Sequence, residues 1–225
     1  MSPDRAQSVP LLSQSSFSVL QPFLGVESFT NLGTSSKISW WLGILGSFLT
    51  VENQMANPLP TSLFLSKVPT RITRASIDGW QIDGEILGVT RVLRTPHIAL
   101  TSIAINAPAS VEDGLRAKIG LGAGLTPEGD DEVAGFLSVA RVLGISHSLD
   151  GSEWKHDRTT TFSGALLDAA FHGFAIPVVA DAARQFAHGG ITSRTREALL
   201  AVGHTSGAAL LRGMRTAQQC FRRAA

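Results

Sequence analysis

Glycines and carboxylates are concentrated in residues 120–135, which read G-L-G-A-G-L-T-P-E-G-D-D-E-V-A-G. Gly120, Gly122 and Gly124 alternate, so the backbone can adopt conformations closed to residues with a Cβ, and a ligand can approach it closely. Asp130 and Asp131 follow just after. Exposed amides at a helix N-terminus bind anions, and carboxylates beside them can orient an amide or hold a cation. The segment is therefore predicted to contact a ligand.

A helix is expected to follow this loop directly. Thr126-Pro127 is a helix-start signal, because a Thr side chain can cap free amides and Pro suits the first helical position. Apolar residues at 133, 136, 137, 140 and 143 repeat with the period of a helix that has one buried face. Acidic residues stabilise a helix N-terminus without any function, each by roughly 0.3–1 kcal/mol. Gly129 favours a site instead, since a glycine in the first turn costs up to about 1 kcal/mol relative to Ala.

A second segment repeats this order of residue types. Gly203-His204-Thr205-Ser206-Gly207 precedes a helical pattern that continues to about Phe221. Two such helix starts could aim their amides at one anionic group. The alternative is two ordinary capped helices, with Thr205 or Ser206 as the cap and His204 at the surface. The first segment is not a nucleotide fingerprint, because Asp130-Asp131 stand where the Walker motif needs Lys-Ser/Thr, and the spacing G-x-G-x-x-G is not met.

Composition and charge exclude several classes of function. The 225 residues carry a formal net charge of +1 and 16% charged residues, which gives no sign of a nucleic-acid binder. A single cysteine, Cys220, excludes an internal disulfide framework and a cysteine-based zinc site. The longest apolar run, residues 40–51, is shorter than the roughly 20 residues of a membrane span, and a signal sequence is lacking. The chain is expected to be soluble and cytoplasmic, with no membrane contact.

The predicted secondary structure changes from β to α along the chain. Residues 1–35 are expected to form a poorly ordered lead-in. Residues 36–108 contain short Val-, Ile- and Thr-rich runs, the last over 97–105, separated by turn signals. The predicted fold class is α+β, with an N-terminal antiparallel β-rich sheet or small barrel followed by a C-terminal α-helical part over 109–225. The expected helices cover 110–118, 127–143, 163–171, 177–187, 193–202 and the pattern after 203–207.

Three segments in order resemble the AllH-like family, over roughly residues 115–215. The first is the loop of residues 120–135, where the family's usual run is G-x-G-P-G-L-T-P-S-G-D-D. The others are T-T-T-F-S-G-A-L-L-D-A-A-F-H-G at 159–173 and V-G-H-T-S-G-A-A-L-L-R-G at 202–213. The chain departs from the family at Ala123, Glu128 and Glu132, and at Ala208-Ala209, where a carboxylate is often present.

The resemblance implies a subunit of oxamate carbamoyltransferase, an enzyme of anaerobic allantoin breakdown. AllH acts there with FdrA and AllG proteins, and a carbamoyl group moves between oxalurate and phosphate. Most members of the family have no established activity, so the resemblance implies an enzyme class without fixing this chain's substrate.

Two hypotheses follow from the residues and the resemblance together. In the first, the chain is a cytoplasmic carbamoyltransferase-type subunit that binds a small carboxylate or phosphate anion. Asp130 and Asp131 would orient a substrate amide or hold a divalent cation such as Mg²⁺, and His204 would be the acid or base. The amides and hydroxyls that would hold the anion belong to Gly122, Gly124, Thr126, Gly129, Thr205, Ser206 and Gly207. In the second, the chain is a non-catalytic binding or scaffold subunit, and the loop shapes an interface with FdrA-like and AllG-like partners.

Overall fold

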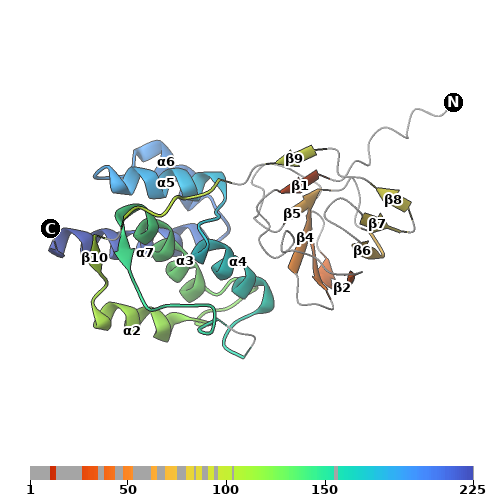
Figure 1. Cartoon of the computed structure of the whole chain (residues 1–225), viewed down its shortest axis with the longest axis horizontal. Coiled ribbons are helices and arrows are strands. Elements are labelled where there is room, and N and C mark those ends of the chain that lie inside the picture. The colour runs from red at the N-terminus through yellow and green to blue at the C-terminus, as the bar shows by residue number, and fades with distance from the viewer. Residues whose placement is uncertain are drawn as a thin grey trace. The chain divides into compact units, whose positions relative to one another are not determined.

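The computed structural model describes residues 11–13, 27–34, 38–43, 48–52, 62–64, 69–74, 80–83, 85–87, 91–93, 96–102, 104–154 and 157–224. The chain divides into two compact units, Met1–Thr95 and Pro96–Ala225 (Figure 1). Residues 96–108, which the sequence grouped with the β-rich part, therefore belong to the second unit. Most of the lead-in expected over residues 1–35 lies outside the described residues.

The described parts of the first unit are short strands: β1 (Leu11–Ser13), β2 (Glu27–Thr34), β3 (Ile38–Gly43), β4 (Phe48–Glu52), β5 (Ser62–Phe64), β6 (Ile72–Arg74), β7 (Trp80–Ile82), β8 (Glu85–Leu87) and β9 (Arg91–Leu93). They pair in the order β8-β7-β6-β2-β3-β4-β5-β1-β9. The pairs β4–β5 and β1–β9 are parallel, so among these strands the sheet is mixed. The β-rich N-terminal part expected over residues 36–108 is not confirmed, and the pair β4–β5 departs from the antiparallel pairing expected there. The mixed α and β character of the chain is confirmed.

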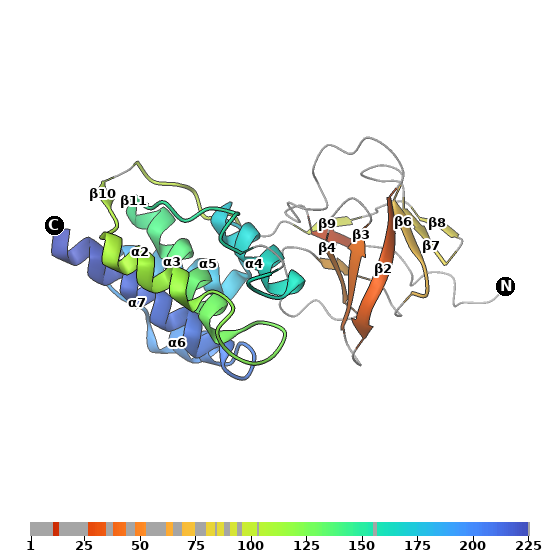
Figure 2. The ribbon, with the colours of Figure 1, turned by 90° about the horizontal axis from the view of Figure 1, so that it is seen from below.

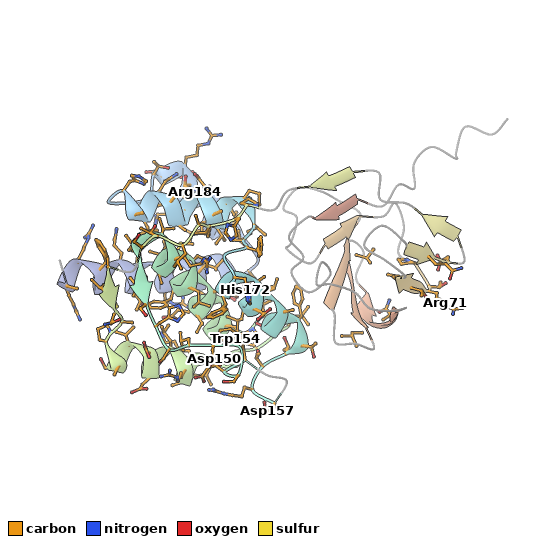
Figure 3. The ribbon with its side chains drawn as sticks, viewed as in Figure 1. Arg71, Asp150, Trp154, Asp157, His172 and Arg184 are labelled. Carbon is orange, nitrogen blue, oxygen red and sulfur yellow. The ribbon has the colours of Figure 1, made fainter. Side chains whose placement is uncertain are left out.

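The second unit is a bundle of helices around α3 (Figure 2). Its described helices are α2 (Ala109–Lys118), α3 (Glu128–Leu143), α4 (Thr161–Phe171), α5 (Pro177–Ala187), α6 (Ser193–Leu200) and α7 (Ser206–Ala224), with a parallel pair of short strands, β10 (Ile105–Asn106) and β11 (Ile145–Ser146). The apolar stripe predicted for α3 is confirmed as core, since Val133, Phe136 and Ala140 are fully buried. Trp154 packs on Phe171 of α4, with ring centroids 5.8 Å apart (Figure 3).

Helices α3 and α7 cross at glycines. A Cβ on Gly213 would lie 1.8 Å from the carbonyl oxygen of Glu132, and a Cβ on Gly135 would lie 2.1 Å from that of Leu210. Neither position can accept a side chain without moving backbone. The crossing therefore brings the N-terminal ends of the two helices together, and these ends carry the two glycine segments that the sequence analysis identified.

The predicted helices agree with the structure, but the cap predicted for α3 is wrong. Helix α3 begins at Glu128 with Pro127 as its N-cap, and no side chain caps it, so Thr126 is not the cap. Helix α2 likewise has Pro108 at its N-cap without a side-chain hydrogen bond. Helix α4 does have a side-chain cap, because the Thr160 hydroxyl accepts from the amide of Ser163.

The strand predicted over residues 97–105 is also wrong for most of its length. Its amides donate to carbonyls of the helical unit: Ile98 to Gly173 at 2.7 Å, and Thr101 to Arg141 at 2.9 Å. Among the described residues of this segment, only a bridge at His97 and the short β10 pair as strands. No helix in the described part of the chain is both long and apolar enough to span a membrane.

Candidate functional site

The two glycine segments meet at the N-terminal ends of α3 and α7. The hydroxyl oxygens of Thr126 and Ser206 lie 3.5 Å apart, although 80 positions separate them in the sequence. Residues close to each of them in the sequence line one pocket of about 570 Å³. The pocket is lined by Lys118, Leu121, Gly122, Ala123, Gly124, Glu128, Gly129, Glu132, His204, Thr205 and Arg212.

The predicted site residues divide into two groups. Half of them line the pocket, namely Gly122, Gly124, Gly129, His204 and Thr205. The remainder, Thr126, Asp130, Asp131, Ser206 and Gly207, are not among its lining residues. Both segments thus contribute to one pocket, while neither aspartate lines it.

The backbone amides of the first loop are available to a ligand. Those of the five consecutive residues Gly122 to Thr126 donate no hydrogen bond to any part of the chain that the structure describes. Residues 121–125 are exposed, and Gly122 and Gly124 have φ of 122° and 95°. No atom lies within 4 Å of a Cβ built on Gly124, so glycine is needed there for its backbone conformation and not for space.

Gly129 and Gly207 have a different reason to be glycine. A Cβ on Gly129 would lie 1.9 Å from the carbonyl oxygen of Lys118, and one on Gly207 would lie 2.0 Å from that of Leu199. Their amides are already used within the protein, by the carbonyls of Leu121 and Val202, each at 2.9 Å. Both glycines permit close packing, which also explains the helix-breaking residue in the first turn of α3.

Asp130 is surrounded by donors of the protein itself. Its side chain is 1% exposed, and its carboxylate accepts from the amide of Gly120 at 2.7 Å and from the hydroxyl of Ser163 at 2.6 Å. The hydroxyl of Thr159 donates to it as well. With both oxygens used, Asp130 joins the start of the glycine loop to the start of α4. This arrangement fastens the loop in place.

Asp131 is buried, and its carboxylate is only partly hydrogen-bonded. Burial raises the pKa of Asp131 to about 6, against a hydrogen bond from Ser206 that lowers it, and the charges of Asp130 and Glu128 raise it further. Its Oδ2 is buried and has no hydrogen-bond partner among the described residues. These two aspartates fit a magnesium ion poorly. The oxygens of Asp130 are occupied, and the described residues contain no group of three or more His, Cys, Asp or Glu side chains placed for a metal.

Two cations and two carboxylates of the pocket were missed by sequence reasoning. Lys118 pairs with Glu132, and Arg212 pairs with both acids, at 2.9 Å from Nη2 to Glu128 and 3.3 Å from Nε to Glu132. A signal for Arg212 existed. It lies seven or eight residues after Thr205 and His204, a spacing of two helical turns, in the helix that these residues precede. Lys118 stands two residues before the glycine loop.

Comparison with known protein families gave a match for residues 118–218. This span matches the family model described as oxamate carbamoyltransferase subunit AllH. Searches of curated proteins and of solved structures each gave no match. The matched span contains the glycine loop, the start of α4 and the second glycine segment, which are the three segments on which the resemblance was based. Over residues 118–218 the chain is therefore similar to the AllH-like family, as those three segments indicated.

Proposed function

We propose that the chain is a subunit of a carbamoyltransferase-type enzyme of the oxamate carbamoyltransferase kind, and that its pocket binds a small carboxylate or phosphate anion. The observation that supports this proposal is the convergence of two helix N-termini on one pocket that also contains Lys118 and Arg212. A cytoplasmic location and the lack of nucleic-acid contact remain part of the proposal.

The amides account for the expected preference for anions. Two cations and two carboxylates line the pocket, so its side chains other than His204 are formally neutral. The unpaired amides of residues 122–126 and the N-terminal ends of α3 and α7 add partial positive charge on top of this balance. An anion in the pocket would accept hydrogen bonds from these amides and from Arg212.

The same groups can serve carbamoyl transfer. As the amide nitrogen of oxamate attacks carbamoyl phosphate, a C–N bond forms, the C–O bond to phosphate breaks, and the nitrogen loses a proton. His204 lines the pocket and is exposed, so it could take that proton. The amides would stabilise the departing phosphate. Asp130 would act as a positioning residue, because its carboxylate is used in fixing the loop.

Calorimetric titration with phosphate and with oxamate tests the site. Gly124→Ala should weaken binding at least about tenfold, because φ near 95° strains any residue with a Cβ and the loop must change shape. Gly189→Ala is its control, since Gly189 has φ of 102°, equally free surroundings and a place outside the pocket. Equal affinities in the two variants would remove the site from this loop.

The variant Arg212→Gln tests the same pocket independently of the glycine loop. We expect about a tenfold or greater loss of anion affinity, because a hydrogen bond to a charged group contributes roughly 1.5–3 kcal/mol. Arg215→Gln is the control, since Arg215 is exposed on the same helix and is not part of the pocket. A matching loss in both variants would indicate a general charge effect instead of a pocket.

The second candidate is a non-catalytic subunit whose partner supplies the chemistry. Exposed apolar side chains favour it: Leu121 is 60% exposed, Leu125 41% and Leu200 37%, all on or next to the two segments. Among the described residues that line the pocket, there is also no serine or cysteine that could act as a nucleophile. Carbamoyl transfer by the chain alone would exclude this candidate. Transfer that requires added FdrA-like and AllG-like proteins would support it.

A further inference from the structure

Glu128 lies at the pocket with one carboxylate oxygen unused. Its Oε2 accepts from Arg212, whereas Oε1 accepts no hydrogen bond from the described part of the chain. Glu132 differs, because Lys118 and Arg212 each hold one of its oxygens and its side chain is only 10% exposed. Among the two acids of the pocket, Glu128 is therefore the one that can act on a ligand.

The position of Glu128 places this acceptor beside the anion-binding amides. Glu128 is the first residue of α3, and the loop packs against it so closely that a Cβ on Gly122 would lie 2.7 Å from its amide nitrogen. A ligand held by the loop amides in this pocket would thus also meet Glu128 and Arg212, which line it. The carboxylate repels a second negative charge at that point and accepts a hydrogen bond from an N–H group.

We infer that Glu128 is a specificity-determining residue, which makes the pocket select anions that carry an amide N–H next to their charge over anions that carry a second charge there. This inference rests on the proposed function. Oxamate and oxalate form the matched pair of probes, since they share size and shape, and differ in an amide in place of a carboxylate. The wild-type chain should bind oxamate more tightly than oxalate.

Calorimetric titration of both probes into the wild-type chain and Glu128→Gln tests the inference. The variant keeps the shape of the side chain and an acceptor oxygen but loses the charge. Oxalate should gain at least about fivefold in affinity, because two like charges about 4 Å apart repel by about 1 kcal/mol even in water. Oxamate should change less, so the ratio of the two affinities should shift toward oxalate.

Asp113→Asn is the control, because it removes an exposed carboxylate that also pairs with an arginine, at 3.3 Å from Arg116, outside the pocket. It should leave the ratio unchanged. In the wild-type chain, discrimination against oxalate should shrink as salt is raised, which gives a second measurement without a variant. An unchanged ratio in Glu128→Gln, with oxamate still bound, would overturn the inference alone. Failure of the wild-type chain to bind oxamate, oxalate or phosphate would overturn the proposed function, and this inference with it.

Discussion

Replacement of Gly213 by Ala tests whether the close crossing of α3 and α7 holds the pocket together. The new Cβ would lie 1.8 Å from the Glu132 carbonyl oxygen, which is backbone and cannot rotate away. The helices would have to separate by more than about 1 Å to reach ordinary contact distance. Alanine gains about 1 kcal/mol of helix propensity, but overpacking costs typically 1–3 kcal/mol and more when backbone must move. We expect a net loss of about 2 kcal/mol in unfolding free energy.

Gly114→Ala is the matched control on α2. Gly114 is helical and exposed, and no atom lies within 4 Å of its Cβ position, so the same substitution should stabilise by up to about 1 kcal/mol. Urea unfolding followed by the helical circular dichroism signal measures both variants, and thermal midpoints should move in opposite directions by roughly 2–8 °C. Phosphate affinity should fall in Gly213→Ala only, because the crossing positions both segments. If Gly213→Ala is as stable as Gly114→Ala, the helices do not approach as closely as described.

The remaining predictions concern Asp130 and Asp131, which do not line the pocket. Because burial raises the pKa of Asp131 to about 6, its ionised form is less stable in the fold than in the unfolded chain, where the group ionises near its usual 3.8. This penalty is absent below about pH 4 and complete above about pH 6. Asp131→Asn should therefore stabilise the chain by at most about 3 kcal/mol at pH 7 and lose this advantage toward pH 4. Urea unfolding across pH measures the effect, and a difference in unfolding free energy that does not change with pH would contradict the prediction. Asp130→Ala should destabilise by about 3 kcal/mol or more, since the Gly120 amide and the Ser163 hydroxyl lose a buried charged acceptor; a cost as small as that of Asp113→Asn would show that the loop does not depend on Asp130.

Local patterns in the sequence were sufficient to place the helices of the second unit. The period of apolar residues reports one buried face, and this depends on neighbours within a few turns. The span predicted for α5 matches the structure at both ends, and the buried face of α3 agrees residue by residue. The glycine segments were also recognisable, because positive φ and helix starts have local signatures. Their meeting was predicted as a hypothesis, from the shared chemistry of two helix starts.

What each polar residue does was decided only by the tertiary structure. Asp130 and Asp131 are adjacent and chemically identical, yet one is enclosed by three donors and the other has a buried oxygen without a partner. Arg212 meets Glu128 across 84 positions of sequence. The sequence by itself therefore determined which segments form helices and where anion-binding amides could arise, since both follow from local spacing. The tertiary structure decided that Asp130 fastens the loop and that Glu128 lines the pocket, because burial and hydrogen-bond partners are properties of the packed helices.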